Sequence, residues 1–187
     1  MPRISVSSGR TVSDKVMIFI DGSNLYHSVR SIHGRTDLDF ASFSQQLAAG
    51  RQLLRTYYYN AAVDQAKEPQ RYSNQQRFFD KLETGSKVEV KLGTLVYRNF
   101  PQVPPYEKGI DVRLATDMLT HAFRQNYDVA ILVSGDNDFA DAVQAVKDLG
   151  RTVEIALFGN PGSSRRLRDV ADDVIALDAN FLNACWT

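Results

Sequence analysis

Aspartate residues follow two apolar segments of this sequence, and their type and spacing suit a divalent metal ion. Residues 16–20 are followed by DGSN (21–24), and residues 129–133 are followed by SGDND (134–138). If both segments are neighbouring parallel strands, these carboxylates meet at one edge of the sheet, where they repel each other unless protonated or bridged by a cation. All-oxygen ligation by aspartate favours Mg²⁺ or Mn²⁺ over a soft metal.

Helix capping is the competing explanation for each aspartate. A carboxylate just before a helix accepts hydrogen bonds from free backbone N–H groups and is favoured by the helix dipole. Two motifs of the same design, each after a fully apolar segment, are harder to explain by capping, and Asp138 adds a carboxylate where one cap would suffice. The pattern therefore predicts a metal site that contains Asp21, Asp136 and Asp138.

A third acidic element is the segment KGIDVRLATD at residues 108–117. Asp111 falls in the first turn of a predicted helix, and Asp117 is rotated from it by about 120° at 3.6 residues per turn. Both side chains cannot point straight into one site, so we expect Asp111 to ligate directly or through water and Asp117 to be an outer or structural contact. Lys108 precedes the helix, where it can reach a phosphate or remain solvated.

The three motifs together resemble the NYN domain and, more narrowly, its LabA-like branch, whose domain is related to the PIN nucleases. The likeness spans roughly residues 16–177 and rests on IDGSNL (20–25), KGID with the following LA and D (108–117), and SGDNDF (134–139), in order. It implies a PIN-like Rossmannoid fold and Mg²⁺- or Mn²⁺-dependent ribonuclease chemistry. Carried over by position, the metal-site acids fall on Asp21, Asp111, Asp136 and Asp138, and the other motif positions are Asn24, Lys108 and Asp117.

Strands and helices that alternate along the chain must position these residues. Apolar runs bounded by turn residues predict buried strands, and helical periodicity predicts the segments between them. The alternation predicts an α/β fold with a mainly parallel sheet, helices on both faces, and a ligand site beyond the carboxyl ends of the strands. We expect strands at 16–20, 53–60, 87–97 (with Gly93 as a candidate break), 129–133, 153–158 and 174–177. We expect helices at 24–32 (with Ser23 as the candidate cap), from 39 onward, at 69–83, at 110–124, at 139–149 and around 167. The segment 99–108 is predicted to be a loop.

The composition is that of one globular domain. The chain has 187 residues, 43% of them hydrophobic, and a formal net charge of zero, so no global positive field attracts nucleic acid. The single Cys185 excludes an intramolecular disulfide and a cysteine-based zinc site. Without a signal-like or membrane-spanning segment, we expect a cytoplasmic protein with no membrane contact. We expect a flexible arm at residues 1–14 and a single domain at residues 15–187.

An anionic substrate that approaches an acidic pocket requires cations on the rim. The segment 97–106 mixes Arg98 with aromatic residues, as single-strand stacking surfaces do. An ordinary solvated surface is the competing explanation for these cations. The candidate rim residues are Arg98, Arg113, Arg165, Arg166 and Arg168, besides Lys108.

The predicted function is metal-dependent hydrolysis of phosphodiester bonds in RNA, and the sequence leaves DNA open as the alternative substrate. One or two ions would polarise the phosphoryl oxygens and activate water, which Asn24 or Ser134 would orient. A phosphatase of the haloacid dehalogenase type is disfavoured because Ser23 stands where its second aspartate belongs, and a dinucleotide oxidoreductase because no G-x-G-x-x-G follows a strand. The main alternative is a catalytically weak, metal-holding domain that binds RNA or protein as a regulator. The sequence does not indicate an oligomeric state.

Overall fold

The central feature of the molecule is a seven-stranded sheet with the strand order β4-β3-β2-β1-β5-β6-β7. The computed structural model describes residues 14–84, 87–159 and 164–187. All neighbouring strands pair in parallel except the edge strand β4, which is antiparallel to β3. The strands are β1 (Lys15–Asp21), β2 (Gln52–Ala62), β3 (Val88–Val96), β4 (Tyr106–Lys108), β5 (Val129–Val133), β6 (Thr152–Leu157) and β7 (Asp173–Ala176).

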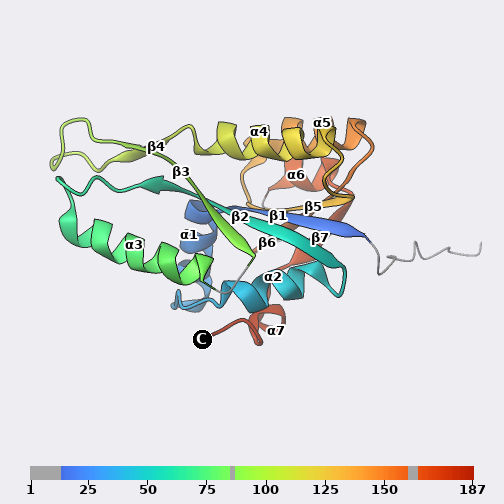
Figure 1. The fold of residues 1–187 in the computed structure, drawn as a ribbon, viewed down its shortest axis with the longest axis horizontal. Helices are drawn as coiled ribbons and strands as arrows, with labels where there is room; N and C mark the ends of the chain where they lie inside the picture. The colour runs from blue at the N-terminus through green and yellow to red at the C-terminus, as the bar shows by residue number, and fades with distance from the viewer. Residues whose placement is uncertain (1–13, 85–86, 160–163) are drawn as a thin grey trace, which may run out of the picture.

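Helices cover both faces of this sheet, which confirms the predicted α/β class (Figure 1). Helices α1, α2, α3 and α7 lie on one face, and α4, α5 and α6 lie on the other. The predicted arm at residues 1–14 lies outside the described residues except for Asp14. The helices are α1 (Gly22–His33), α2 (Phe40–Ala48), α3 (Pro69–Glu83), α4 (Ile110–Phe123), the 3₁₀ helix η1 (Asn137–Phe139), α5 (Ala140–Asp148), α6 (Arg165–Val170) and α7 (Ala179–Leu182).

Two hydrophobic cores lie against the sheet, one on each face. In β1, Val16, Ile18 and Ile20 belong to the core beneath α1 and α2, whereas Met17 and Phe19 belong to the core beneath α4 and α5. Because both faces are covered, every residue between 16 and 20 must be apolar, which explains the continuous apolar run. The strand order reverses between β1 and β5, so their carboxyl ends form the switch point at which ligands bind in such sheets.

The segment 99–108 was expected to be a loop, and this prediction is wrong at its end. Residues Tyr106–Lys108 form β4, in which Glu107 pairs with Leu95 of β3. A short strand at the edge of a sheet forms by pairing its backbone with the one strand beside it. The prolines that precede it in the chain therefore do not prevent it from forming. Strand β3 also runs unbroken through Gly93, where a Cβ would lie 2.3 Å from Ile110 Cδ1. Glycine at this position therefore permits α4 to lie directly on β3.

The cap of α1 also differs from the prediction. The helix begins at Gly22, and its N-cap is Asp21 rather than Ser23, because Asp21 Oδ1 accepts a hydrogen bond from the Asn24 N–H at 3.0 Å. Among the described residues, no helix combines the length and apolar character needed to cross a bilayer.

A buried ion pair joins the turn after α2 to β6. The Arg51 guanidinium donates to both carboxylate oxygens of Glu154, at 2.7 and 2.9 Å, and both side chains are buried. It also donates to the carbonyl oxygens of Leu47 and Ala48. The pair therefore links the α2 end of the molecule to the sheet through charge-assisted hydrogen bonds.

We expect Arg51→Met to lower the free energy of unfolding by about 3–5 kcal/mol, because it removes the cation beside a buried carboxylate. Urea denaturation measures this loss. The double variant Arg51→Met/Glu154→Leu is the control and should recover most of the stability, because no buried charge then remains at this position. A double variant as unstable as the single one would contradict this account.

Candidate metal centre

The two aspartate motifs meet at the carboxyl ends of β1 and β5. These strands are neighbours, and their register pairs Ile20 with Val133, so the next residues, Asp21 and Ser134, lie side by side. The Ser134 hydroxyl donates to Asp21 Oδ2 at 3.0 Å, and Asn24 Oδ1 accepts from the Gly135 N–H at 3.0 Å. Two hydrogen bonds thus join segments that lie more than one hundred residues apart in sequence.

Capping explains part of the role of both motif aspartates. Asp21 caps α1, and Asp136 Oδ1 accepts from the Asp138 N–H at 2.9 Å, which caps η1. A carboxylate has about four lone-pair positions, so one or two capping bonds leave room for a metal ion or water. Asp21 is 6% exposed, whereas Asp136 is half-buried and Asp138 is exposed. Capping therefore fixes these carboxylates in place without using all of their oxygen lone pairs.

Raised pKa values indicate that the acidic residues lie in one region. Burial raises the pKa of Asp21, and the negative charge of Asp136 raises it further. The pKa of Asp111, in the first turn of α4, is raised by partial burial and then by the charges of Asp21, Asp136 and Asp138. The acidic cluster, as we name it, comprises Asp21, Glu107, Asp111, Asp136 and Asp138.

Glu107 is the member of the acidic cluster that was missed from the sequence. Burial raises the pKa of its carboxyl, and the charges of Asp21 and Asp111 raise it further. The residue was assigned to a loop, so nothing placed it beside the first motif. Its position directly before Lys108, in a segment that leads into Asp111, was the available signal. The pairing of β4 with β3 brings it to the cluster.

Other predicted residues lie outside the cluster. Asp117 Oδ2 accepts from the Tyr59 hydroxyl at 3.0 Å, a contact that ties α4 to β2. Lys108 ends β4 and is exposed.

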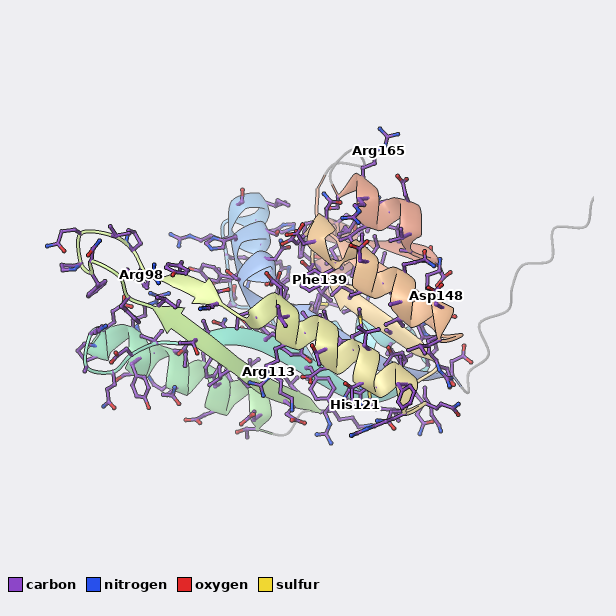
Figure 2. All side chains as sticks on the ribbon, turned by 90° about the horizontal axis from the view of Figure 1, so that it is seen from above. Arg98, Arg113, His121, Phe139, Asp148 and Arg165 are labelled. Atoms are coloured by element: carbon purple, nitrogen blue, oxygen red, sulfur yellow. The ribbon has the colours of Figure 1, made fainter. Side chains whose placement is uncertain are left out.

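The predicted rim arginines are dispersed over the surface. Figure 2 shows Arg98 in the β3–β4 connection and Arg165 at the start of α6, at opposite sides of the molecule. Arg113 Nη1 donates to the Leu92 carbonyl oxygen at 2.6 Å, so its guanidinium lies on β3. Arg166 donates to Asp141 of α5, while Arg168 is half-buried. These five residues do not form one continuous patch.

The donor set fits a hard, hydrated cation. Among the described residues, no three Asp, Glu, His or Cys side chains lie close enough together to hold a metal ion, so the four predicted ligands do not form one coordination shell here. Mg²⁺, however, keeps several waters and is commonly held by one or two carboxylates. The negative charges that raise the pKa of Asp21 and of Asp111 are also those whose repulsion a divalent cation relieves. The cluster therefore suits Mg²⁺ or Mn²⁺ bound partly through water.

Comparison with known proteins identifies the family. Residues 15–178 match the NYN domain. The chain belongs to the NYN family. NYN domains are PIN-like, and the PIN-like fold is that of a nuclease family, which agrees with the α/β architecture and with the position of the acidic cluster at the switch point.

Two similar proteins extend the comparison, one by sequence and one by fold. An uncharacterized protein of Methanocaldococcus jannaschii is 35% identical over 72 residues, which are 38% of this chain and 30% of that protein. The match thus spans less than a third of the archaeal protein's length. A protein of unknown function from Vibrio parahaemolyticus, whose crystal structure is solved, is 24% identical with a TM-score of 0.64 over 93% of this chain and 99% of its own. The Vibrio protein shares the fold.

The raised pKa of Asp21 predicts a pH dependence of stability. Because the folded-state pKa lies above the unfolded value, stability falls as pH rises from the ordinary aspartate range through the raised pKa. Asp136→Asn removes one cause of that rise and retains a good capping residue. We expect the variant, in EDTA at pH 7, to be more stable than the wild type by on the order of 1 kcal/mol.

Denaturation between pH 3 and pH 8 in EDTA measures this difference, which should vanish below about pH 3, where the carboxyls are protonated. Asp148→Asn, at the far end of α5 in Figure 2, is the matched control and should change stability little. If Asp136→Asn is less stable than the wild type at pH 7 while Asp148→Asn is unchanged, repulsion between Asp136 and Asp21 is contradicted.

Proposed function

We propose that this NYN domain hydrolyses phosphodiester bonds of RNA with bound Mg²⁺ or Mn²⁺, and that it belongs to the LabA-like branch of the family. The observation that carries the proposal is the hydrogen-bonded junction of Asp21 and Ser134 at the switch point, near carboxylates whose charges raise the pKa of Asp21 and of Asp111. NYN nucleases usually act on RNA, and the three motifs resemble those of the LabA-like branch, which supports the finer assignment.

Asp21 and Asp136 would hold the cation, and the exposed Asp111 and Asp138 would hold it directly or through water. When bound, the ion would polarise a phosphoryl oxygen and lower the pKa of a water molecule. The Ser134 hydroxyl fixes the orientation of the Asp21 carboxylate, and it also accepts from the Asp136 N–H at 3.2 Å. One serine thus positions both metal-site aspartates.

Asn24 and Lys108 would act on the substrate side of the site. Asn24 holds the Gly135 backbone through its Oδ1 atom, so its amide N–H groups remain the donors that can orient water or a phosphate oxygen. Lys108 lies three residues before Asp111, at the end of β4, where its ammonium can neutralise a phosphate beside the acidic cluster. We propose these two residues as substrate contacts.

A regulatory domain with little turnover is the second candidate function. It would hold a metal ion and bind RNA or protein without rapid cleavage. The observation in its favour is that the described residues place no three acidic side chains close enough to hold a metal together. A site of this kind can bind a hydrated ion while the reacting groups remain poorly positioned.

We expect the purified protein to cleave labelled single-stranded RNA in Mn²⁺, and Asp136→Asn to be slower by roughly 100-fold or more, since a metal-holding carboxylate is lost. The rate of product formation on a denaturing gel measures this, and labelled single-stranded DNA in parallel reactions tests the other substrate. Asp148→Asn should retain wild-type activity. Equal cleavage by the wild type and Asp136→Asn would reveal a contaminant and remove the nuclease proposal, whereas RNA binding without cleavage would favour the regulator.

We also expect Ser134→Ala to weaken Mn²⁺ binding by roughly 10- to 100-fold, because the hydroxyl orients the Asp21 carboxylate and holds the Asp136 backbone without needing to touch the ion. Titration calorimetry measures the affinity. Asp117→Asn changes a carboxylate that contacts Tyr59 instead of the cluster, and it should bind Mn²⁺ as the wild type does. An equal loss of affinity in both variants would mean that the ion is not held at the β1–β5 junction.

A further inference from the structure

A cavity of about 390 Å³ adjoins the acidic cluster. It lies between α1 and α3, on the sheet face that both helices cover (Figure 1). Gly22 and Ser23, which directly follow Asp21, line it, and so does Glu107 of the cluster. A group bound in the cavity would therefore be a close neighbour of a group bound at the β1–β5 junction. The volume falls at the lower end of the range of small-molecule sites and suits a single nucleoside.

The cavity combines aromatic rings with amide groups. Tyr58 and Phe78 line it with ring centroids 5.6 Å apart, and Tyr26 lines it from α1. Asn60 at the end of β2 and Asn74 on α3 add amide groups to the same wall. Flat apolar surfaces together with a few directional polar groups are what a heterocyclic base requires, because it stacks through its faces and forms hydrogen bonds along its edge.

The Tyr58 hydroxyl is a buried donor that lines the cavity. Its side chain is 3% exposed, and its oxygen accepts a hydrogen bond from Asn60 Nδ2 at 3.3 Å. Within the described part of the chain, no hydrogen bond uses the hydroxyl proton itself. The hydroxyl oxygen therefore already has a partner, and its proton is available to an acceptor atom of a ligand in the cavity.

The charges on the lining favour a neutral occupant. Glu107 is the carboxylate of the cavity wall. The lining also includes His27 and Arg71, and the Arg71 guanidinium is already paired with Glu68 at 3.0 Å. A phosphate placed in the cavity would face Glu107 and the neighbouring Asp21, which repel it. A nucleobase carries no charge, and its N–H groups can donate to Glu107.

We propose that the cavity between α1 and α3 binds one nucleobase of the strand whose phosphodiester lies at the acidic cluster. The proposal rests on the nuclease function for the position of the phosphodiester. The base stacks against the aromatic wall, its acceptors receive the Tyr58 proton, and its donors meet amide or carboxylate oxygens. A base anchored beside the cluster fixes the adjacent phosphate in register, so the cavity determines which nucleotide is presented for cleavage.

The test measures binding without metal and therefore without cleavage. The full chain in EDTA is titrated with AMP, GMP, CMP and UMP, and with ribose 5-phosphate as a ligand that lacks the base, by ligand-observed NMR. We expect at least one nucleotide to bind roughly tenfold or more tightly than ribose 5-phosphate, because stacking and edge contacts require the base. Nucleotides that bind no better than ribose 5-phosphate overturn the proposal.

Two tryptophan variants on α3 form a test and its matched control. Asn74→Trp places an indole at an exposed position on the cavity wall and should weaken nucleotide binding by roughly tenfold or more. Ser73→Trp adds the same side chain at an exposed neighbouring position that does not line the cavity, and binding should be retained. Equal affinities in the two variants overturn the proposal.

Tyr58→Phe keeps the aromatic ring and removes only the hydroxyl. We expect it to fold and to bind the preferred nucleotide more weakly, with a changed ranking of the four bases; an unchanged ranking overturns the role of the hydroxyl. Nucleotide binding without Mn²⁺-dependent cleavage would reject the nuclease and leave the base site. Cleavage by a protein that binds no nucleotide would reject the base site and leave the nuclease.

Discussion

The arrangement of the site depends on one buried carboxylate at a strand junction. Asp21 ends a strand that is apolar on both faces, and its oxygens accept from the Asn24 N–H at the start of α1 and from the Ser134 hydroxyl at the end of β5. A parallel sheet that reverses its order between these strands leaves a crevice there, and helices begin on both sides of it. The same carboxylate thus starts α1, joins two strands and brings the second motif beside the first.

The negative charge of Asp21 and its neighbours makes this junction less stable than neutral side chains would. Burial raises the pKa of Asp21, and Asp136 adds repulsion, so the protein holds negative charges where the fold alone would favour neutral groups. Sites built for cation chemistry commonly retain such unfavourable charge, since the ligand that relieves it is also the one that the reaction needs. The buried Arg51–Glu154 pair, by contrast, neutralises its own charge and needs no ligand.

The strands and the main helices could be predicted from sequence because their signals are local. Apolar runs between turn residues located β1 and β5, and Pro69 with the helical pattern after it located α3. Glu107 could not be placed, because its position depends on the pairing of β4 with β3, a non-local contact within a segment whose prolines indicate a loop. The cap of α1 was misassigned to Ser23 because aspartate and serine cap equally well, and only the backbone geometry distinguishes them.

Adjacent tyrosines of β2 connect the two halves of the site. Successive strand residues point to opposite faces, so Tyr58 lies in the wall of the cavity beside α1 and α3, while Tyr59 donates to Asp117 of α4 on the other face. Helix α4 carries Asp111. The start of α1 lies against β2, an approach that only glycine permits, because a Cβ on Gly22 would lie 2.5 Å from Tyr58 Cζ. A shift of β2 along its axis would therefore move the cavity wall and the helix of Asp111 together. Strand β2, which carries none of the residues of the acidic cluster, thus keeps the cavity and the carboxylates in a fixed relation, as the proposed substrate that spans both would require.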